Sequence, residues 1–71
     1  MPEKELGHIG NIIRQRRATL GITQEHLAEL SGVGLRTIRE IERGKGKSLP
    51  ILIRVTDALG LVVQLSIRQV K

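Results

Sequence analysis

Apolar residues recur every three or four positions along the first sixty residues, which is the spacing of amphipathic helices. Helix start and stop signals divide this pattern into four segments. We therefore predict four helices, with approximate bounds 6–20, 24–31, 35–43 and 49–59. Residues 1–5 are polar, and we expect them to be loose.

Capping residues mark the ends of these helices. Thr23 is the predicted N-cap of the second helix and Ser48 that of the fourth, in which Pro50 is tolerated in the first turn. Gly32 and Gly44 follow the second and third helices, where glycine suits the end of a helix. The positions that continue the apolar pattern are Ile9, Ile13, Leu20, Leu27, Ala28, Leu30, Val33, Ile38, Ile41, Ile51, Leu52, Val55, Ala58 and Leu59.

The period changes after Gly60, where LVVQLSIR alternates as a β-strand does. A lone strand leaves its backbone donors and acceptors unpaired. We expect it to pair antiparallel with the same strand of a second copy across a two-fold axis, and a helical or frayed tail is the alternative. The residues assigned to this dimerisation strand are Leu61, Val63, Leu65 and Ile67.

Together these elements predict an all-α fold, a compact four-helix domain over 6–60. A flexible N-terminus, 1–5, precedes it, and a C-terminal β-strand region, 61–71, pairs across the homodimer. A core formed by 71 residues is worth only about 3–5 kcal/mol. The chain has no cysteine for a disulfide, so association with a second copy is the expected source of further stability.

The charge of the chain favours a polyanionic partner. Its net charge is +5 and its pI is near 10.8. It has no aromatic residues to stack on unpaired bases, which leaves double-stranded DNA as the expected partner. No apolar run approaches the ~18 residues that span a bilayer, and no signal peptide is visible, so we expect a cytoplasmic protein that does not enter a membrane.

The sequence offers no catalytic site. Gly46-Lys47-Ser48 matches the end of a nucleotide-binding phosphate loop, but the motif requires a glycine at the position that Ile41 occupies. Cysteine is absent, and the two histidines lie far apart without a carboxylate cluster, so neither a metal site nor a cofactor is expected. The chain is predicted not to be an enzyme.

The run GITQEHLAELSGVGLRTIREIERGKGKSLPILIRVTDALG, residues 21–60, resembles the lambda-repressor-like, or XRE-type, helix-turn-helix family. The family spacing is matched by Ala28, Gly32, Val33, Ile38, Ile41, Glu42, Gly44, Ala58, Leu59 and Gly60. The tail LGLVVQLSIRQVK is similar to that of HipB-like antitoxins, which implies a two-stranded sheet between the copies of a dimer.

The resemblance implies that the third helix enters the major groove of DNA. Arg36 and Arg39 are then the main candidates for base contacts, because a guanidinium matches the two acceptors of guanine. Leu35 is placed to touch a thymine methyl group, and Glu40 to accept from cytosine. The alternative is a solvated charged helix face.

The resemblance also implies contacts to the DNA backbone. Glycines 44 and 46 are expected to let the main chain approach the phosphates closely. Gly34 departs from the family, which usually has a Ser or Thr hydroxyl at this cap. Arg14 and Arg16 are further candidates, or they only solubilise the first helix. The phosphate-binding residues predicted are Gln24, Gly34, Thr37, Arg43, Lys45 and Lys47.

Arg17 and Glu42 fall at family positions that form an ion pair between the first and third helices. The pair implies a structural role for Glu42 rather than base reading, since removing one partner leaves an unpaired charge.

The predicted function is a dimeric repressor that binds a palindromic operator. The tail resemblance adds an antitoxin role, with a cognate toxin protein as partner and repression of a shared operon. The competing hypothesis is a protein-interaction module that kept the fold without specific DNA binding.

Overall fold

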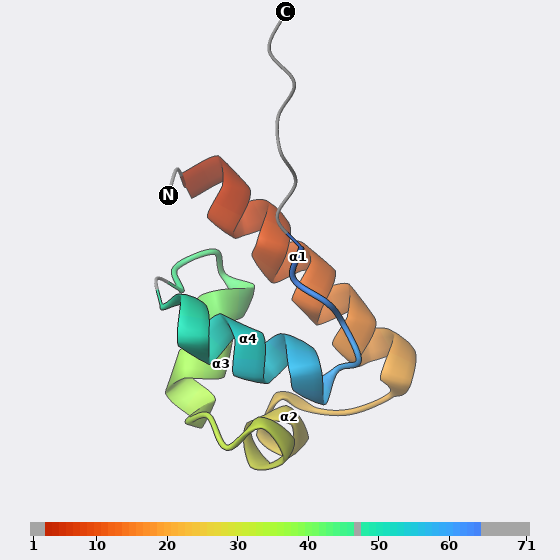
Figure 1. The fold of residues 1–71 in the computed structure, drawn as a ribbon. Helices are drawn as coiled ribbons and strands as arrows, with labels where there is room; N and C mark the ends of the chain where they lie inside the picture. The colour runs from red at the N-terminus through yellow and green to blue at the C-terminus, as the bar shows by residue number, and fades with distance from the viewer. Residues whose placement is uncertain (1–2, 47, 65–71) are drawn as a thin grey trace, which may run out of the picture.

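The computed structural model describes residues 3–46 and 48–64, and these residues form four helices. Figure 1 shows them packed around a common centre, with α4 and the segment that follows it on the near side. The helices are α1 (Glu3–Leu20), α2 (Gln24–Ser31), α3 (Leu35–Glu42) and α4 (Leu49–Ala58).

The helices begin and end close to the predicted positions, with one clear difference. Helix α1 begins at Glu3 rather than at residue 6, so the expected loose stretch is wrong for residues 3–5. Glu3, Lys4 and Glu5 are good helix formers, and their lack of apolar side chains hid this turn from the periodicity.

Local hydrogen bonds fix the helix starts. The Thr23 hydroxyl accepts from the His26 amide at 3.0 Å, and the Ser48 hydroxyl accepts from the Ile51 amide at 3.4 Å, so both predicted N-caps are confirmed. Gly32 closes α2 with φ of 68°, in the left-handed region. Such hydroxyl caps stabilise a helix by about 0.5–2 kcal/mol relative to alanine.

The core contains seven buried apolar side chains among the described residues, and all seven belong to the predicted apolar positions. Two other positions of the apolar pattern lie outside the core, since Leu20 is 44% exposed and Leu30 is 56% exposed. Leu20 is the last residue of α1. The core residues are Ile13, Leu27, Val33, Ile38, Ile41, Val55 and Leu59.

The backbones of α1 and α3 touch at one point. A Cβ atom on the buried Gly10 would overlap the carbonyl oxygen of Ile41, so only glycine fits there. Since that atom belongs to the backbone, the close approach fixes the distance between the two helices. It brings the side chains of α1 within reach of the end of α3.

The described part of the predicted C-terminal strand is not a strand in the structure. Residues 61–64 have no strand structure, and the Leu61 amide donates instead to the Thr56 carbonyl at 2.8 Å. Leu65 and Ile67 lie outside the described residues. Pairing with a second copy therefore remains a prediction. Within the described part of the chain, no helix has the length and apolar character needed to cross a membrane.

Candidate nucleic-acid interface

Helix α3 has one buried side and one open side. Ile38 and Ile41 anchor it in the core, while Arg36 and Arg39 are exposed. Among the described residues, no hydrogen bond engages either arginine side chain. Both guanidinium groups therefore keep their full set of donors for an external ligand.

The remaining predicted residues of α3 lie at the margins of this open side. Leu35, Thr37 and Glu40 are each half-buried. Gly34 is the N-cap and provides no side-chain hydrogen bond. A Cβ atom there would meet nothing within 4 Å, so a serine would fit. Packing therefore does not require a glycine at position 34.

An ion pair joins α1 to the end of α3, as the resemblance implied. Arg17 Nε donates to Glu42 Oε2 at 2.7 Å, and its Nη2 donates to Oε1 at 3.0 Å. The Glu42 side chain is only 4% exposed and that of Arg17 is 18% exposed. The hydrogen bond to Glu42 raises the pKa of Arg17 above its ordinary value, although burial opposes the shift. The forked geometry holds the carboxylate in one orientation.

Gln24 joins this pair, which the sequence did not predict. Its Nε2 donates to Glu42 Oε1 at 3.1 Å, so Glu42 is held by side chains from α1 and from α2. The amide of Gln24 retains a second N–H and its carbonyl oxygen. The predicted phosphate contact by Gln24 would use that second N–H, in an orientation set by Glu42.

The loop after α3 carries exposed basic side chains on a tightly packed backbone. Arg43 and Lys45 are exposed, and Lys47 lies outside the described residues. A Cβ atom on Gly44 would lie 2.8 Å from the Gly7 Cα atom, and one on Gly46 would lie 2.6 Å from the Ile41 Cγ1 atom. Packing within the molecule therefore requires both glycines, which is a different reason from the predicted approach to phosphate.

Arg16 has a structural role. Its Nε donates to the Leu59 carbonyl oxygen at 2.9 Å, which satisfies a free carbonyl at the end of α4. The expected contact of this side chain with the DNA backbone is therefore not favoured. Arg14 is exposed and donates to Asn11 one turn earlier on α1.

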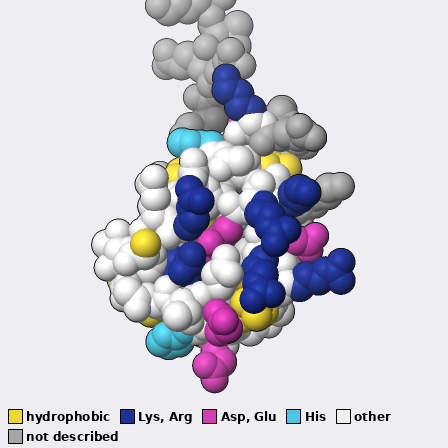
Figure 2. All heavy atoms as spheres, turned by 180° about the vertical axis from the view of Figure 1, so that it is seen from behind, with side chains coloured by type: hydrophobic (Ala, Val, Ile, Leu, Met, Phe, Trp, Pro, Cys, Tyr) yellow, Lys and Arg dark blue, Asp and Glu magenta, His cyan; other side chains and the backbone are white. Residues whose placement is uncertain are grey.

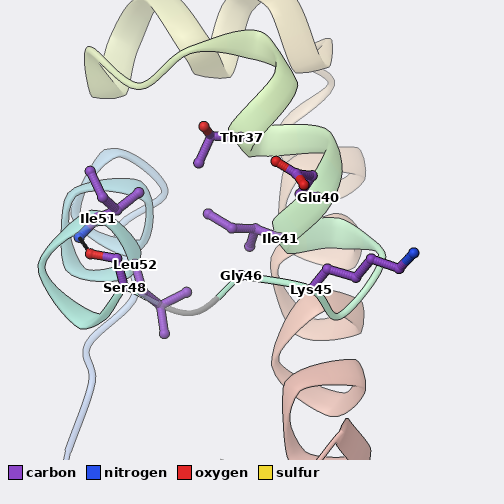
Figure 3. Close-up of a pocket in the computed structure, with 8 residues that line it drawn as sticks. All are labelled: Thr37, Glu40, Ile41, Lys45, Gly46, Ser48, Ile51 and Leu52. Carbon is purple, nitrogen blue, oxygen red and sulfur yellow. Dashed lines mark hydrogen bonds between the residues drawn. The ribbon is translucent and has the colours of Figure 1, made fainter.

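A hollow of about 370 Å³ separates α3 from α4. Figure 3 shows Ile41, Ile51 and Leu52 around it, with Thr37 and Glu40 on the side of α3 and Lys45 pointing away. Its lining mixes apolar side chains with a few polar groups at the surface.

Basic side chains dominate the face that carries α3. Figure 2, drawn from behind the view of Figure 1, shows Lys and Arg side chains gathered there with acidic groups between and below them. No group of three or more potential metal ligands occurs among the described residues. Exposed basic side chains gathered in this way are typical of a surface that binds an anion.

The helix-turn-helix family model matches residues 13–62. The chain belongs to the XRE-type helix-turn-helix family. The match covers α2, α3 and the turn between them, which are the two helices that give this family its name.

Two relatives have been named as regulators. One, from Methanothermobacter thermautotrophicus, is called an uncharacterized HTH-type transcriptional regulator. It is 46% identical to this chain over 50 residues, and the match covers 69% of this chain and 72% of the relative. Another, from Rhodospirillum rubrum, is called an uncharacterized transcriptional regulator in the ATPase CF(0) region. It is 37% identical over 57 residues, covering 79% of this chain and 53% of that relative. This helix-turn-helix chain thus spans about half the length of the second relative.

Proposed function

We propose that this chain is a transcriptional regulator that binds double-stranded DNA and reads its sequence with α3. The observation that carries the proposal is the open side of α3, where Arg36 and Arg39 are exposed on a helix anchored by the Arg17–Glu42 pair. Membership of the helix-turn-helix family and the names of its relatives support the same function.

Base recognition is assigned to four side chains of α3. Arg36 and Arg39 donate to guanine, Leu35 contacts a thymine methyl group, and Glu40 accepts from cytosine. Contacts to phosphate then fix the register of the helix on the duplex without reading sequence. The phosphate-binding residues proposed are Gln24, Gly34, Thr37, Arg43, Lys45 and Lys47.

Alanine substitutions at Arg36 and Arg39 test base recognition. The preferred duplex is first selected from a random pool, and binding is then measured against that duplex and a scrambled one. Each substitution is expected to cost about 1–3 kcal/mol on the preferred duplex and to reduce discrimination against the scrambled one. Arg54→Ala removes the same charge from α4 and serves as the matched control. Unchanged discrimination in both α3 variants would overturn the assignment.

A dimeric repressor is the architecture that we propose for this regulator. Two copies related by a two-fold axis present two α3 helices to half-sites roughly 34 Å apart, so the selected operator is expected to be a palindrome. Pairing of strands 61–68 from two copies is part of this proposal. Ser66→Pro removes a backbone donor from that ladder and should weaken the dimer, whereas an unaffected dimer would argue against the strand.

The antitoxin role adds a toxin protein as a second partner. It rests on the resemblance of the tail alone, and co-purification with the product of a neighbouring gene tests it. The interaction module without specific DNA binding is the remaining alternative. It would be favoured if the α3 arginine variants lost a protein partner while their affinity for DNA stayed unchanged.

A further inference from the structure

The hollow between α3 and α4 has an apolar floor. Ile41 lies at its base, because this side chain belongs to the core and is only 4% exposed, and the half-buried Ile51 and Leu52 lie beside it on α4. Figure 3 shows the three side chains around one open space. A volume of about 370 Å³ is within the range of small-molecule sites, which are mostly apolar with a few polar groups.

Three polar side chains complete the lining of the hollow. The Ser48 hydroxyl at the start of α4 is engaged, since it accepts from the Ile51 amide at 3.4 Å. Thr37 and Glu40 lie on the side of α3 and are half-buried. Among the described residues, neither a hydrogen bond nor an ion pair engages the side chain of Thr37 or Glu40. These two groups are therefore open to a molecule in the hollow.

The charges of the lining favour a cation. Glu40 carries the single carboxylate among the described lining residues, and Lys45, their one basic group, points away from the hollow. A half-buried carboxylate attracts a cation in direct contact more strongly than an exposed one does, because less water screens the interaction. The net charge of +5 acts over longer distances, and salt screens it beyond about 8–10 Å.

The apolar floor sets the other half of the ligand. A cation bound to Glu40 would place its hydrocarbon part against Ile41, Ile51 and Leu52, which one chain leaves partly uncovered on the side of α4. Each methylene group buried there is expected to improve affinity by up to about fourfold. A bare inorganic cation would gain nothing from this floor.

We propose that the hollow between α3 and α4 binds a small aliphatic ammonium compound, with its charged nitrogen on Glu40 and its alkyl chain against the apolar floor. Thr37 lies one turn before Glu40 on α3, so its hydroxyl is placed to accept a second N–H from the same nitrogen. An ammonium group has three such donors.

The ligand and DNA would compete for α3, a consequence that rests on the proposed function. Glu40 is the residue proposed to accept from cytosine, and Thr37 is one of the proposed phosphate contacts. An ammonium group on the carboxylate uses the same acceptor, so the two ligands exclude each other there. The ammonium compound would then be an effector that releases the chain from its preferred duplex.

Binding is tested first on the free chain, without DNA. Hexylamine, hexanol and hexanoate are the probes, because they share an alkyl chain and differ in charge. In NMR titrations of the labelled chain, hexylamine is expected to give saturable shifts at Thr37, Ile41 and Ile51, and hexanoate the weakest response. Butylamine, shorter by two methylene groups, should bind roughly tenfold more weakly. Equal responses to the three hexyl probes, shifts at Val62 in place of Ile51, or no saturable binding would overturn the site.

A substitution at Glu40 tests the role of its charge. Glu40→Gln keeps the size of the side chain and is expected to weaken hexylamine binding by roughly fivefold while leaving hexanol unaffected. Glu29→Gln makes the same change at an exposed position of α2 and should have no effect on either probe. Parental affinity of Glu40→Gln for hexylamine would overturn the assignment of Glu40. The amide spectrum of each variant verifies its fold.

Competition with DNA separates the site from its effect. Hexylamine should lower the affinity of the chain for its selected duplex more than ammonium chloride does at the same concentration, which controls for ionic strength. Equal effects of the two salts would overturn the effector role, although the titration without DNA would still establish the site. A chain that bound no duplex at all would refute the proposed function and the effector role together, and again leave the cation site standing.

Discussion

At the scale of single residues, Glu42 connects more of the molecule than any charge on the open side of α3. Its carboxylate accepts from Arg17 on α1 and from Gln24 on α2, so three helices meet at one group. Every buried side-chain nitrogen or oxygen of the described residues has a hydrogen-bond partner. A satisfied network of this kind is costly to break, because the remaining partners stay desolvated.

Glu42→Ala is therefore expected to destabilise the protein by about 3 kcal/mol, since it leaves the Arg17 guanidinium without its carboxylate. Such a loss is most of the stability available to a chain of this size. Urea denaturation followed by circular dichroism measures it. Glu29→Ala, at an exposed position of α2, should shift stability by no more than about 0.5 kcal/mol. Equal stability of Glu42→Ala and the parent would refute the structural role of Glu42.

At the scale of elements, the crossing of α1 and α3 sets the position of the proposed DNA-reading helix. The two backbones approach at Gly10 and Ile41, and Gly44 in the loop after α3 lies against Gly7. The spacing of these helices is therefore limited by backbone contact rather than by compressible side chains. A small change in this spacing would move Arg36 and Arg39 relative to α1.

Two identical substitutions on α1 should have opposite effects. Gly10→Ala forces its Cβ against the Ile41 carbonyl and is expected to cost about 1–3 kcal/mol. Gly7→Ala places its Cβ where nothing lies within 4 Å, so the gain in helix propensity should stabilise the protein by up to about 1 kcal/mol. Thermal unfolding of both variants provides the comparison. Similar melting temperatures for the two would contradict the contact between α1 and α3.

At the scale of the whole molecule, basic side chains gather on the face that carries α3. Large hydrophobic side chains are exposed on α1, α4 and the segment after it. The net charge of +5 is carried by individual side chains, and Lys45 is one of the exposed ones.

Affinity for DNA should fall steeply with salt, because each phosphate neutralised contributes about −0.9 to the slope of log affinity against log salt concentration. Lys45→Ala is expected to reduce the magnitude of this slope by about 1 for each protomer and to weaken all duplexes similarly. Arg36→Ala should act mainly on the preferred duplex. Fluorescence anisotropy over a series of salt concentrations distinguishes the effects of the two variants. An unchanged slope for Lys45→Ala would show that Lys45 does not contact a phosphate.

The sequence predicted the local features of this protein well. The four helices, the N-caps Thr23 and Ser48, and the buried Val33 all follow from hydrogen bonds and apolar spacing within a few residues. The same reasoning placed Leu20 and Leu30 on the apolar faces, although both are exposed. Periodicity identifies a helix face, but the neighbouring elements decide how much of that face is covered.

The sequence by itself determined approximately where helices begin and end and which apolar positions are candidates for the core, because those properties depend on near neighbours along the chain. Only the tertiary structure decided that Gln24 bonds to Glu42, that Arg16 holds the end of α4, and that Gly10 touches Ile41. Each of these contacts joins residues at least 18 positions apart. Their geometry depends on how the helices cross, which no local pattern specifies.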